Sequence, residues 1–471
     1  MLMRSRAKSF LLGQGGLSVH LSAITSVQIL VSFGIQLYTV TCFGAGRETD
    51  ALYTGLTLPL TLTVLIIETF TVVVIPLLTA ESEEELRKLG WQLFLGSTGF
   101  FFLVCLLLYV LAPLFVPLLV PGFTQAQQQL TVRMTRIQVW VLIGNGCYAV
   151  LSALYQVRNR FVWVLLSQLL ASLVGAFLLV WKLKSFGIMF GAWMQLLIAT
   201  VPVILLLPVL GSLPRQLGWR SELFKKIWQN MKPMLMGKAY FMINAPIDRV
   251  LASHLAPGTI VIFELVGRFY NAILRILNKG IVMPTLPPLS RLAQEGKWEK
   301  FLSLYRRKSL QMGAIGLVII LAIIAAVTLG RIFAAPLHLA AITGKLSSEN
   351  LSVLWLITLL MAAVLPSTCI ANVQGNAFFA QRDTATPTRI GVVFCTIGFG
   401  TKIAGFFLAG IKGVVLAGTF GAVGTAIVNE VVLRRRVANK IRQGAPTSSS
   451  TISLNPLSPL MSEPVSSVEG S

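Results

Sequence analysis

The sequence predicts an all-α polytopic membrane protein in which about twelve transmembrane helices form two pseudo-symmetric six-helix lobes around a central cavity. Hydrophobic residues make up 55% of the 471 residues and charged residues only 12%, and the mean hydropathy is +0.78. These values lie outside the range of soluble domains. Apolar runs of about 20 residues, long enough to cross a hydrocarbon core of about 30 Å, recur along the whole chain.

These runs place each expected span. The first lobe, 21–210, holds spans at 21–43, 51–79, 91–119, 130–157, 161–181 and 188–210. The second lobe, 233–433, holds spans at 233–255, 260–284, 309–330, 351–373, 389–410 and 413–433. Outside the lobes we expect a cytoplasmic segment at 1–20, a cytoplasmic linker at 211–232 with an amphipathic helix near Glu222–Gln229, and a basic, then disordered tail at 434–471.

The net charge of +22 follows the predicted topology. The amino-terminal segment, the even-numbered connections and the tail hold 25 Lys and Arg residues, whereas the odd-numbered connections hold 8. Loops rich in Lys and Arg stay in the cytoplasm, so both termini are expected there. We expect the chain to lie in a bacterial cytoplasmic (inner) membrane. Topology accounts for the charge, and we expect no nucleic-acid partner.

An internal repeat predicts the two lobes. The segments FGAGRETDALYTGL and LAPGTIVIFELVGR align at an offset of 212 residues, which superposes Gly46 on Gly258. ALYQVRN and AFFAQRD align at an offset of 224, which pairs Arg158 with Arg382. Two halves with an even number of spans share one orientation, as in transporters that rock two lobes about a central site.

The eighth predicted span carries a polar stripe. Glu264, Arg268, Asn271, Arg275 and Lys279 fall within an arc of about 100° on a helix. Each ionised side chain near a span centre costs about 2.5–3.5 kcal/mol, so the stripe is expected to face protein or water. Guanidinium groups bind phosphate bidentately, so the stripe predicts a phosphate-binding site. The alternative is structural: Glu264 and Arg268 neutralise each other, and Lys279 extends to the membrane surface.

Other polar residues within spans are candidates for coupling or gating. Glu68 is interpreted as a packing acid, as a carrier of a proton or cation, or as the partner of a second-lobe arginine across the cavity. Lys238, Asn244 and Asp248 in the seventh span form either an ion site or a Lys–Asp structural contact. Lys402, within two turns of a span end, is expected to extend to the membrane surface.

The chain lacks the usual signs of an enzyme. Its five cysteines lie singly in predicted spans and its three histidines have no neighbour at ligand spacing, so no metal site is expected. The longest external loop, 331–350, offers only His338 and Glu349 as acid–base groups. We therefore expect a monomeric transporter without a cofactor, driven by a monovalent cation, a proton or the membrane potential.

Several segments resemble one known family in order and spacing. These are FGAGRETDALYTGLTLP, VPGFTQAQ, IDRVLASHLAPG, PTLPPLSRLA and FFAQRDTATPTR. They are similar to landmarks of the MviN/MurJ family of lipid II flippases, within the multidrug/oligosaccharidyl-lipid/polysaccharide exporter superfamily. The resemblance implies a V-shaped pair of lobes that moves a polyprenyl-pyrophosphate-linked glycan across the membrane by alternating access. It also implies functional roles for Asp50 and Glu68, which we assign to coupling or gating, and for Arg268, which we assign to substrate binding.

The sequence departs from this family pattern at several positions. Ile29, Ile35, Thr63 and Val64 stand where the family has arginines, and Asn271 stands where it has an acid. Two further carboxy-terminal spans, which in the family shape a groove for the lipid tail, have no counterpart here. We therefore expect a polyprenyl-pyrophosphate glycan other than lipid II, or lipid II moved poorly. The alternatives are an ion-coupled multidrug or small-molecule exporter and, less favoured, a membrane glycosyltransferase or ligase.

Overall fold

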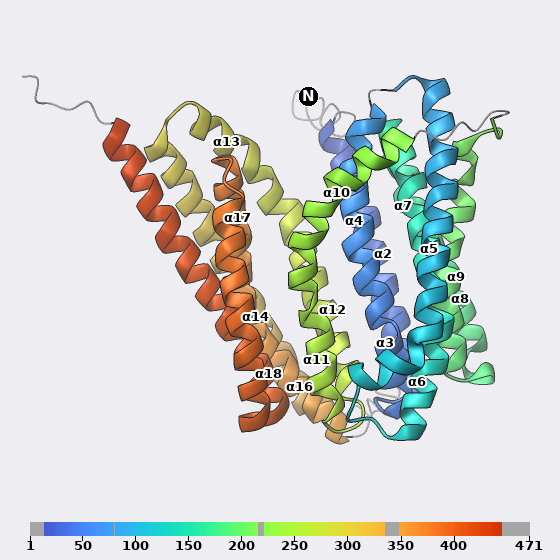
Figure 1. Cartoon of the computed structure of the whole chain (residues 1–471). Coiled ribbons are helices and arrows are strands. Elements are labelled where there is room, and N and C mark those ends of the chain that lie inside the picture. The colour runs from blue at the N-terminus through green and yellow to red at the C-terminus, as the bar shows by residue number, and fades with distance from the viewer. Residues whose placement is uncertain (1–13, 80, 215–220, 335–347, 445–471) are drawn as a thin grey trace, which may run out of the picture.

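The computed structural model describes residues 14–79, 81–214, 221–334 and 348–444, and regular structure within these ranges is helical throughout. The first half of the chain forms α2 (Gln14–Phe43), α3 (Arg47–Gly55), α4 (Thr57–Thr79), α5 (Glu83–Leu119), α6 (Gln125–Gln138), α7 (Val141–Val157), α8 (Phe161–Phe186), α9 (Met189–Leu206) and the short η1 (Leu207–Leu210). The second half forms α10 (Ser221–Met242), α11 (Asn244–Ser253), α12 (Thr259–Leu277), η2 (Asn278–Val282), η3 (Met283–Thr285), α13 (Leu286–Gln294), α14 (Trp298–Ala334), α16 (Ser348–Ala362), α17 (Leu365–Ala380) and α18 (Ala385–Gly444). Figure 1 shows these halves as two bundles that approach each other at one end and diverge at the other.

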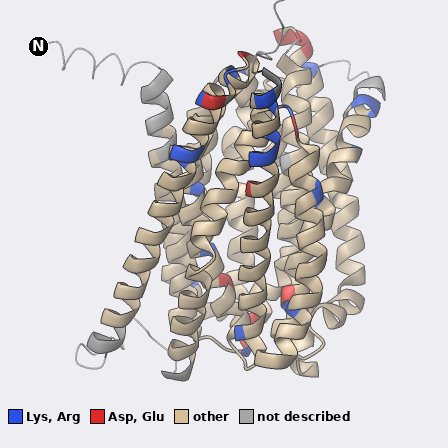
Figure 2. Ribbon diagram, turned by 90° about the vertical axis from the view of Figure 1, so that its left-hand side faces the viewer, with Lys and Arg blue, Asp and Glu red and all other residues tan. Residues whose placement is uncertain are grey.

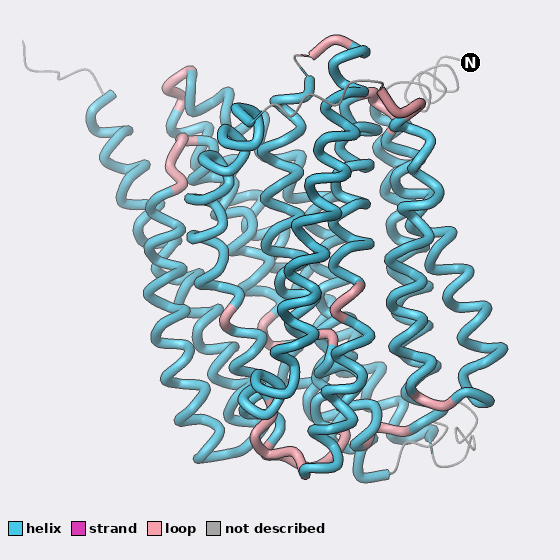
Figure 3. Tube along the Cα trace, turned by 45° about the vertical axis from the view of Figure 1, so that its right-hand side comes forward, coloured by secondary structure: helices cyan, strands magenta, loops and turns pink. Residues whose placement is uncertain are grey.

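The helices present apolar surfaces outward, as a bilayer requires. On α5, for example, Leu114 and Leu118 are 67% and 77% exposed. The same helix begins at a polar cap, where Ser82 accepts a hydrogen bond from the Glu85 amide, and three glutamates follow in its first turn. Figure 3 shows short loops at the two ends of the molecule and a few more partway along the helices.

Nine stretches of the described residues are long and apolar enough to span a membrane. The last of them, Ala385–Arg442, is two spans, because its helix contains non-helical backbone at Ala409 and Gly410. Two further passes, α10–α11 and α12–α13, are more polar than these nine but run lengthwise through the molecule (Figure 1). The expected twelve spans are thereby accounted for.

The turn at Gly410 reverses the chain completely. A Cβ atom added at Gly413 would lie 1.9 Å from the Gly405 carbonyl oxygen, although residues eight apart in a straight helix are about 12 Å apart. Farther along, a Cβ atom at Gly424 would lie 2.3 Å from the Phe394 ring. Both pairs are symmetric about residue 409, so α18 is an antiparallel hairpin of two helices.

The structure confirms the internal repeat and corrects its register at one place. At the offset of 212, α3 begins at Arg47 and α12 at Thr259, each preceded by a glycine at the N-cap. The second pairing is wrong by one residue. The left-handed residues that end α7 and α17 are Asn159 (φ 57°) and Arg382 (φ 58°), which are 223 apart, so Arg382 does not pair with Arg158.

The helix ends explain this correction. A left-handed residue after a helix lets the following amide donate a hydrogen bond to the carbonyl five residues earlier, and this geometry fixes the register. The Arg160 amide donates to the Tyr155 carbonyl, and the Asp383 amide donates to the Phe378 carbonyl. The alignment by sequence similarity paired Arg158 with Arg382, whereas the structure pairs the left-handed residues Asn159 and Arg382.

The helix expected near Glu222–Gln229 is the first part of α10, which continues without a break to Met242. It packs against α4 of the first lobe, and Ile227 and Met231 are buried there. Residues 215–220 lie outside the described part of the chain, so the linker boundaries at 211–232 stay a prediction. The same holds for the ends, where the described residues begin at Gln14 within α2 and end at Gly444 within α18.

At the end opposite α10, a shared apolar core joins the two lobes. Tyr53 of α3 is buried in one cluster with Val261 and Val266 of α12 and Ile357 of α16. The Gly122 amide of the α5–α6 loop donates to Ser253 Oγ at the end of α11, at 3.2 Å. These contacts lie at the lower end of Figure 1, which we call the joined end.

Candidate substrate site

A cavity of about 350 Å³ lies beside the eighth span and contains most of its polar stripe. Its polar lining comes from α11, α12 and α18, namely Asp248, Glu264, Arg268, Asn271 and Lys402. Its apolar lining includes Phe263, Met361, Val364, Val414 and Val415. All of these residues belong to the second lobe, so the charged cavity is built by that lobe alone.

Glu264 is the centre of a buried ion-pair network. Its carboxylate accepts a bond from Arg268 Nε at 3.0 Å and forms a second ion pair with Arg249 of α11. Arg249 is buried, and its Nε also donates to Thr57 Oγ1 of α4 at 3.0 Å. The network therefore joins two helices of the second lobe to one helix of the first.

The geometry of the α11–α12 hairpin brings Arg249 and Glu264 together. The chain turns between α11 and α12, and position 249 lies four residues before the end of α11 while position 264 lies five residues after the start of α12. Antiparallel helices then place the two side chains opposite each other. The expected Glu264–Arg268 contact is confirmed, but it is one half of a three-residue network, which leaves a net positive charge.

A second ion pair closes another side of the same cavity. Lys402 Nζ of α18 lies 2.6 Å from Asp248 Oδ1 and 3.3 Å from Asn244 Oδ1. The side chains of Lys402 and Asp248 are only 13% and 21% exposed. The expectation that Lys402 extends to the membrane surface is therefore wrong, because a buried carboxylate holds it inside the lobe. The partner of Asp248 is this lysine, whereas Lys238 lies on α10 and does not line the cavity.

The face of α12 continues beyond this network toward the end where the lobes diverge. Asn271 and Arg275 are both exposed. Among the described residues, Arg275 has no ion-pair partner, so its guanidinium is available to a ligand. The side chains of Lys279 and Glu68 lie outside the described residues, and their expected roles stay predictions. Figure 2 shows that charged residues are sparse along the middle of the helices.

Asp50 lies apart from the cavity, at the joined end. Its carboxylate is 2% exposed and accepts hydrogen bonds from the Gly258 amide at 2.6 Å and the Val261 amide at 2.9 Å. These amides open α12, so Asp50 of the first lobe caps a helix of the second. Gly258 has φ of +94°, and a Cβ atom there would lie 2.4 Å from the Ala45 carbonyl oxygen. We call these three residues, Asp50, Ala45 and Gly258, the latch.

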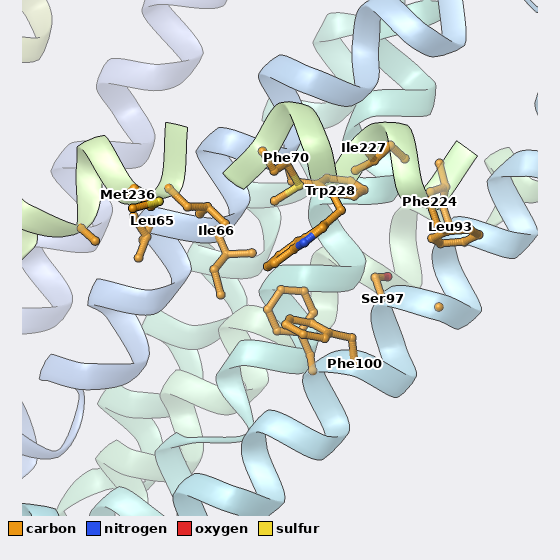
Figure 4. Close-up of a pocket in the computed structure, with 15 residues that line it drawn as sticks. Leu65, Ile66, Phe70, Leu93, Ser97, Phe100, Phe224, Ile227, Trp228 and Met236 are labelled. Atoms are coloured by element: carbon orange, nitrogen blue, oxygen red, sulfur yellow. The ribbon is translucent and has the colours of Figure 1, made fainter. Parts of the chain in front are cut away.

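A second cavity is chemically different. Figure 4 shows this cavity, of about 550 Å³, between α4, α5 and α10, with Phe70, Phe100 and Trp228 among its lining residues. No Lys, Arg, Asp or Glu lines it. Because it offers almost no hydrogen-bonding groups, it cannot hold a charged head group, and the smaller charged cavity is the candidate site.

Comparison with known proteins agrees with this arrangement. The sequence profile of the family described as lipid II flippase MurJ matches residues 39–457. The chain belongs to this family. A probable lipid II flippase MurJ of Haemophilus influenzae is 26% identical over 189 residues, which cover 40% of this chain and 36% of the relative. The match thus spans about a third of that relative's length.

Two solved structures share the fold. A lipid II flippase MurJ in an inward closed conformation has a TM-score of 0.71 at 16% identity, with 90% of this chain and 91% of that chain covered. An inward-facing multidrug resistance transporter of the MATE family has a TM-score of 0.72 at 14% identity, with 89% and 96% covered. The expected family and fold are confirmed, and the family is one of transporters.

Sequence reasoning missed Arg249 and Lys402 as site residues. A signal for Arg249 existed, since it lies four residues before the end of α11 and Glu264 lies five residues after the start of α12, so an antiparallel hairpin brings the two together. Nothing local predicts the contact of Lys402, which is 154 residues from Asp248 along the chain.

Proposed function

We propose that this chain moves a polyprenyl-pyrophosphate-linked glycan across the cytoplasmic membrane by alternating access. One observation carries this proposal: in a member of the lipid II flippase family, a cavity is lined by two ion pairs, and Arg249, which is buried against Glu264 behind the lining, gives the cluster a net positive charge. Three cations, Arg249, Arg268 and Lys402, outnumber the two acids Asp248 and Glu264. An anionic head group would balance this excess charge.

Arg268 is the residue best placed to bind the pyrophosphate. Its Nε atom is bonded to Glu264, which fixes the guanidinium plane and leaves both Nη nitrogens for a ligand. Its guanidinium carbon also lies 5.8 Å from the centre of the Tyr53 ring of the first lobe. A planar guanidinium held in this way binds phosphate oxygens through two parallel hydrogen bonds. Asn271 and the exposed Arg275 extend the binding surface toward the end where the lobes diverge.

The joined end gives the proposal a direction. Basic residues concentrate at the connections opposite the joined end, so the positive-inside rule places that opposite end in the cytoplasm. The lobes then diverge toward the cytoplasm, where a lipid-linked precursor is made available from the inner leaflet. Outward opening would require the contacts at the latch to break.

This orientation predicts which residues can be labelled from outside the cell. A cysteine at Gln125, in the first turn of α6 and exposed, is expected to react with an impermeant maleimide in intact cells. A cysteine at Glu299, exposed in the first turn of α14, is expected to react only after permeabilisation. The unsubstituted chain serves as control for its own cysteines. The reverse pattern would refute the topology.

The alternative is an exporter of small molecules, which the fold of the MATE transporter supports. The charge of the cavity separates the two functions. Cationic drugs would require acids that are free to bind them, but both acids of this cavity are paired with lysine or arginine. The geometry therefore favours an anionic substrate.

Complementation tests which glycan is moved. The first lobe has Ile29, Ile35, Thr63 and Val64 where the family has arginines, and Ile35 is buried in an apolar cluster. The head group would therefore rely on the second lobe, and an unpaired buried charge costs several kcal/mol. In a bacterium depleted of its own lipid II flippase, we expect this chain to rescue growth partially at most. Full rescue at ordinary expression would show that the substrate is lipid II itself.

A further inference from the structure

Lys402 occupies a position that has the ligands of a small cation. Its ammonium group lies between the carboxylate of Asp248 and the amide oxygen of Asn244. Oxygen atoms of these two kinds are the ligands that hard cations prefer. The lysine reaches them from the first half of α18, which packs beside α11 in the second lobe. Figure 1 shows α11 and α18 close to the joined end.

The backbone at this position is interrupted, as it is at many ion sites in transporters. Helix α10 ends at Met242 and α11 begins at Asn244. Pro246 has no amide hydrogen, so the Met242 carbonyl lacks its helical donor. The Asn244 side chain is itself held, because its Nδ2 donates to the Phe241 carbonyl and to Cys395 Sγ, both at 3.2 Å. Its oxygen therefore faces Lys402.

A lysine here differs from a dissolved ion in one respect. The ammonium is attached to α18 and cannot leave, so Asp248 is neutralised without an ion from solution. Removal of the lysine would leave a buried carboxylate with no counter-charge, which is strongly unfavourable. A monovalent cation could then enter the vacated space, since Asp248 and Asn244 would still provide oxygen ligands.

We propose that Lys402 is a built-in counter-cation that fills a monovalent-cation site formed by Asp248 and Asn244, so that no dissolved cation is bound there. The proposal deepens the proposed transport function, because it assigns this part of the cavity a fixed charge instead of an exchangeable coupling ion. Transport by the intact chain would then not depend on sodium at this site.

Thermal unfolding of the purified full-length protein in detergent tests this proposal without any transported substrate. The Tm is measured in sodium chloride and in choline chloride at equal ionic strength, because choline is too large for the site. The wild-type protein is expected to give the same Tm in both salts. Lys402→Ala is expected to have a lower Tm in choline and to gain about 3 °C in sodium, since a ligand bound only by the folded state raises stability.

Two further variants complete the test. Lys402→Met keeps most of the side-chain volume and should show the same sodium dependence if the alanine variant folds poorly. The double variant Asp248→Asn with Lys402→Met removes both charges and should lose the sodium effect. Sodium-specific stabilisation of the wild-type protein, or none in either single variant, would overturn the proposal. A chain that moves no glycan lipid but shows the expected Tm pattern would refute the transport function and leave the cation site standing.

Discussion

Replacing Arg268 with alanine is expected to abolish transport while the protein still folds and reaches the membrane. The substitution removes the two Nη groups that would bind the pyrophosphate, and charge-assisted hydrogen bonds contribute about 1.5–3 kcal/mol each. Two such bonds correspond to a loss of roughly 100-fold or more in transport rate. Folding should survive, because Glu264 keeps its ion pair with the buried Arg249. The measurement is translocation of a fluorescent polyprenyl-pyrophosphate glycan in proteoliposomes.

A matched control variant removes one arginine that lies outside the charged cavity. Arg306 is exposed on α14 and does not line the charged cavity, so Arg306→Ala should transport at the wild-type rate. Arg275→Ala, on the same face of α12 as Arg268, is expected to lose transport as well. If Arg268→Ala and Arg275→Ala both transport like the control, the polar stripe is structural and the proposed site is wrong.

The second large effect is expected at the latch. Gly258→Ala should destabilise the joined end, because its new Cβ atom would lie 2.4 Å from the Ala45 carbonyl oxygen and its φ of +94° is unfavourable for any other residue. Overpacking costs about 1–3 kcal/mol and left-handed backbone about 1–2 kcal/mol, so we expect a loss of order 2–5 kcal/mol. The two hydrogen bonds to Asp50 would weaken at the same time. The measurement is thermal unfolding in detergent.

The internal repeat provides the control for this experiment. Gly46 is the counterpart of Gly258 in the first lobe, its backbone is extended with φ of −163°, and nothing lies within 4 Å of an added Cβ atom. Gly46→Ala should therefore leave the Tm nearly unchanged. Equal Tm values for the two variants would show that the close approach at the latch is not important for stability.

The sequence was sufficient to predict the fold, because a bilayer imposes strong local rules. A run of about 20 apolar residues must span the membrane, and a polar stripe on a membrane-spanning helix must face away from lipid. The α18 hairpin, with its turn at Gly410, fits two of the expected spans, 389–410 and 413–433. The stripe on α12 was predicted in the same way, and three of its members, Glu264, Arg268 and Asn271, line one cavity.

The partners of these residues could not be predicted by the same rules. A helical pattern shows which face is polar but not which distant helix lies opposite, so the pairing of Lys402 with Asp248 had no local signal. Asp50 illustrates the same point. It was expected to act in coupling or gating, and the structure places it on the backbone amides of α12, 208 residues away along the chain. A role in gating stays a proposal, since opening of the joined end would have to break that contact.

The most direct test of the substrate claim is to identify the lipid that the protein retains. The full-length chain would be purified in a mild detergent, and the bound lipids would be extracted and identified by mass spectrometry, with Arg268→Ala purified in parallel. We expect a polyprenyl-pyrophosphate glycan to be enriched with the wild-type protein and depleted at least tenfold with the variant, because about 1.4 kcal/mol of lost binding gives that factor. Equal retention of such a lipid by both proteins, or enrichment of only lipids without a pyrophosphate, would contradict the account.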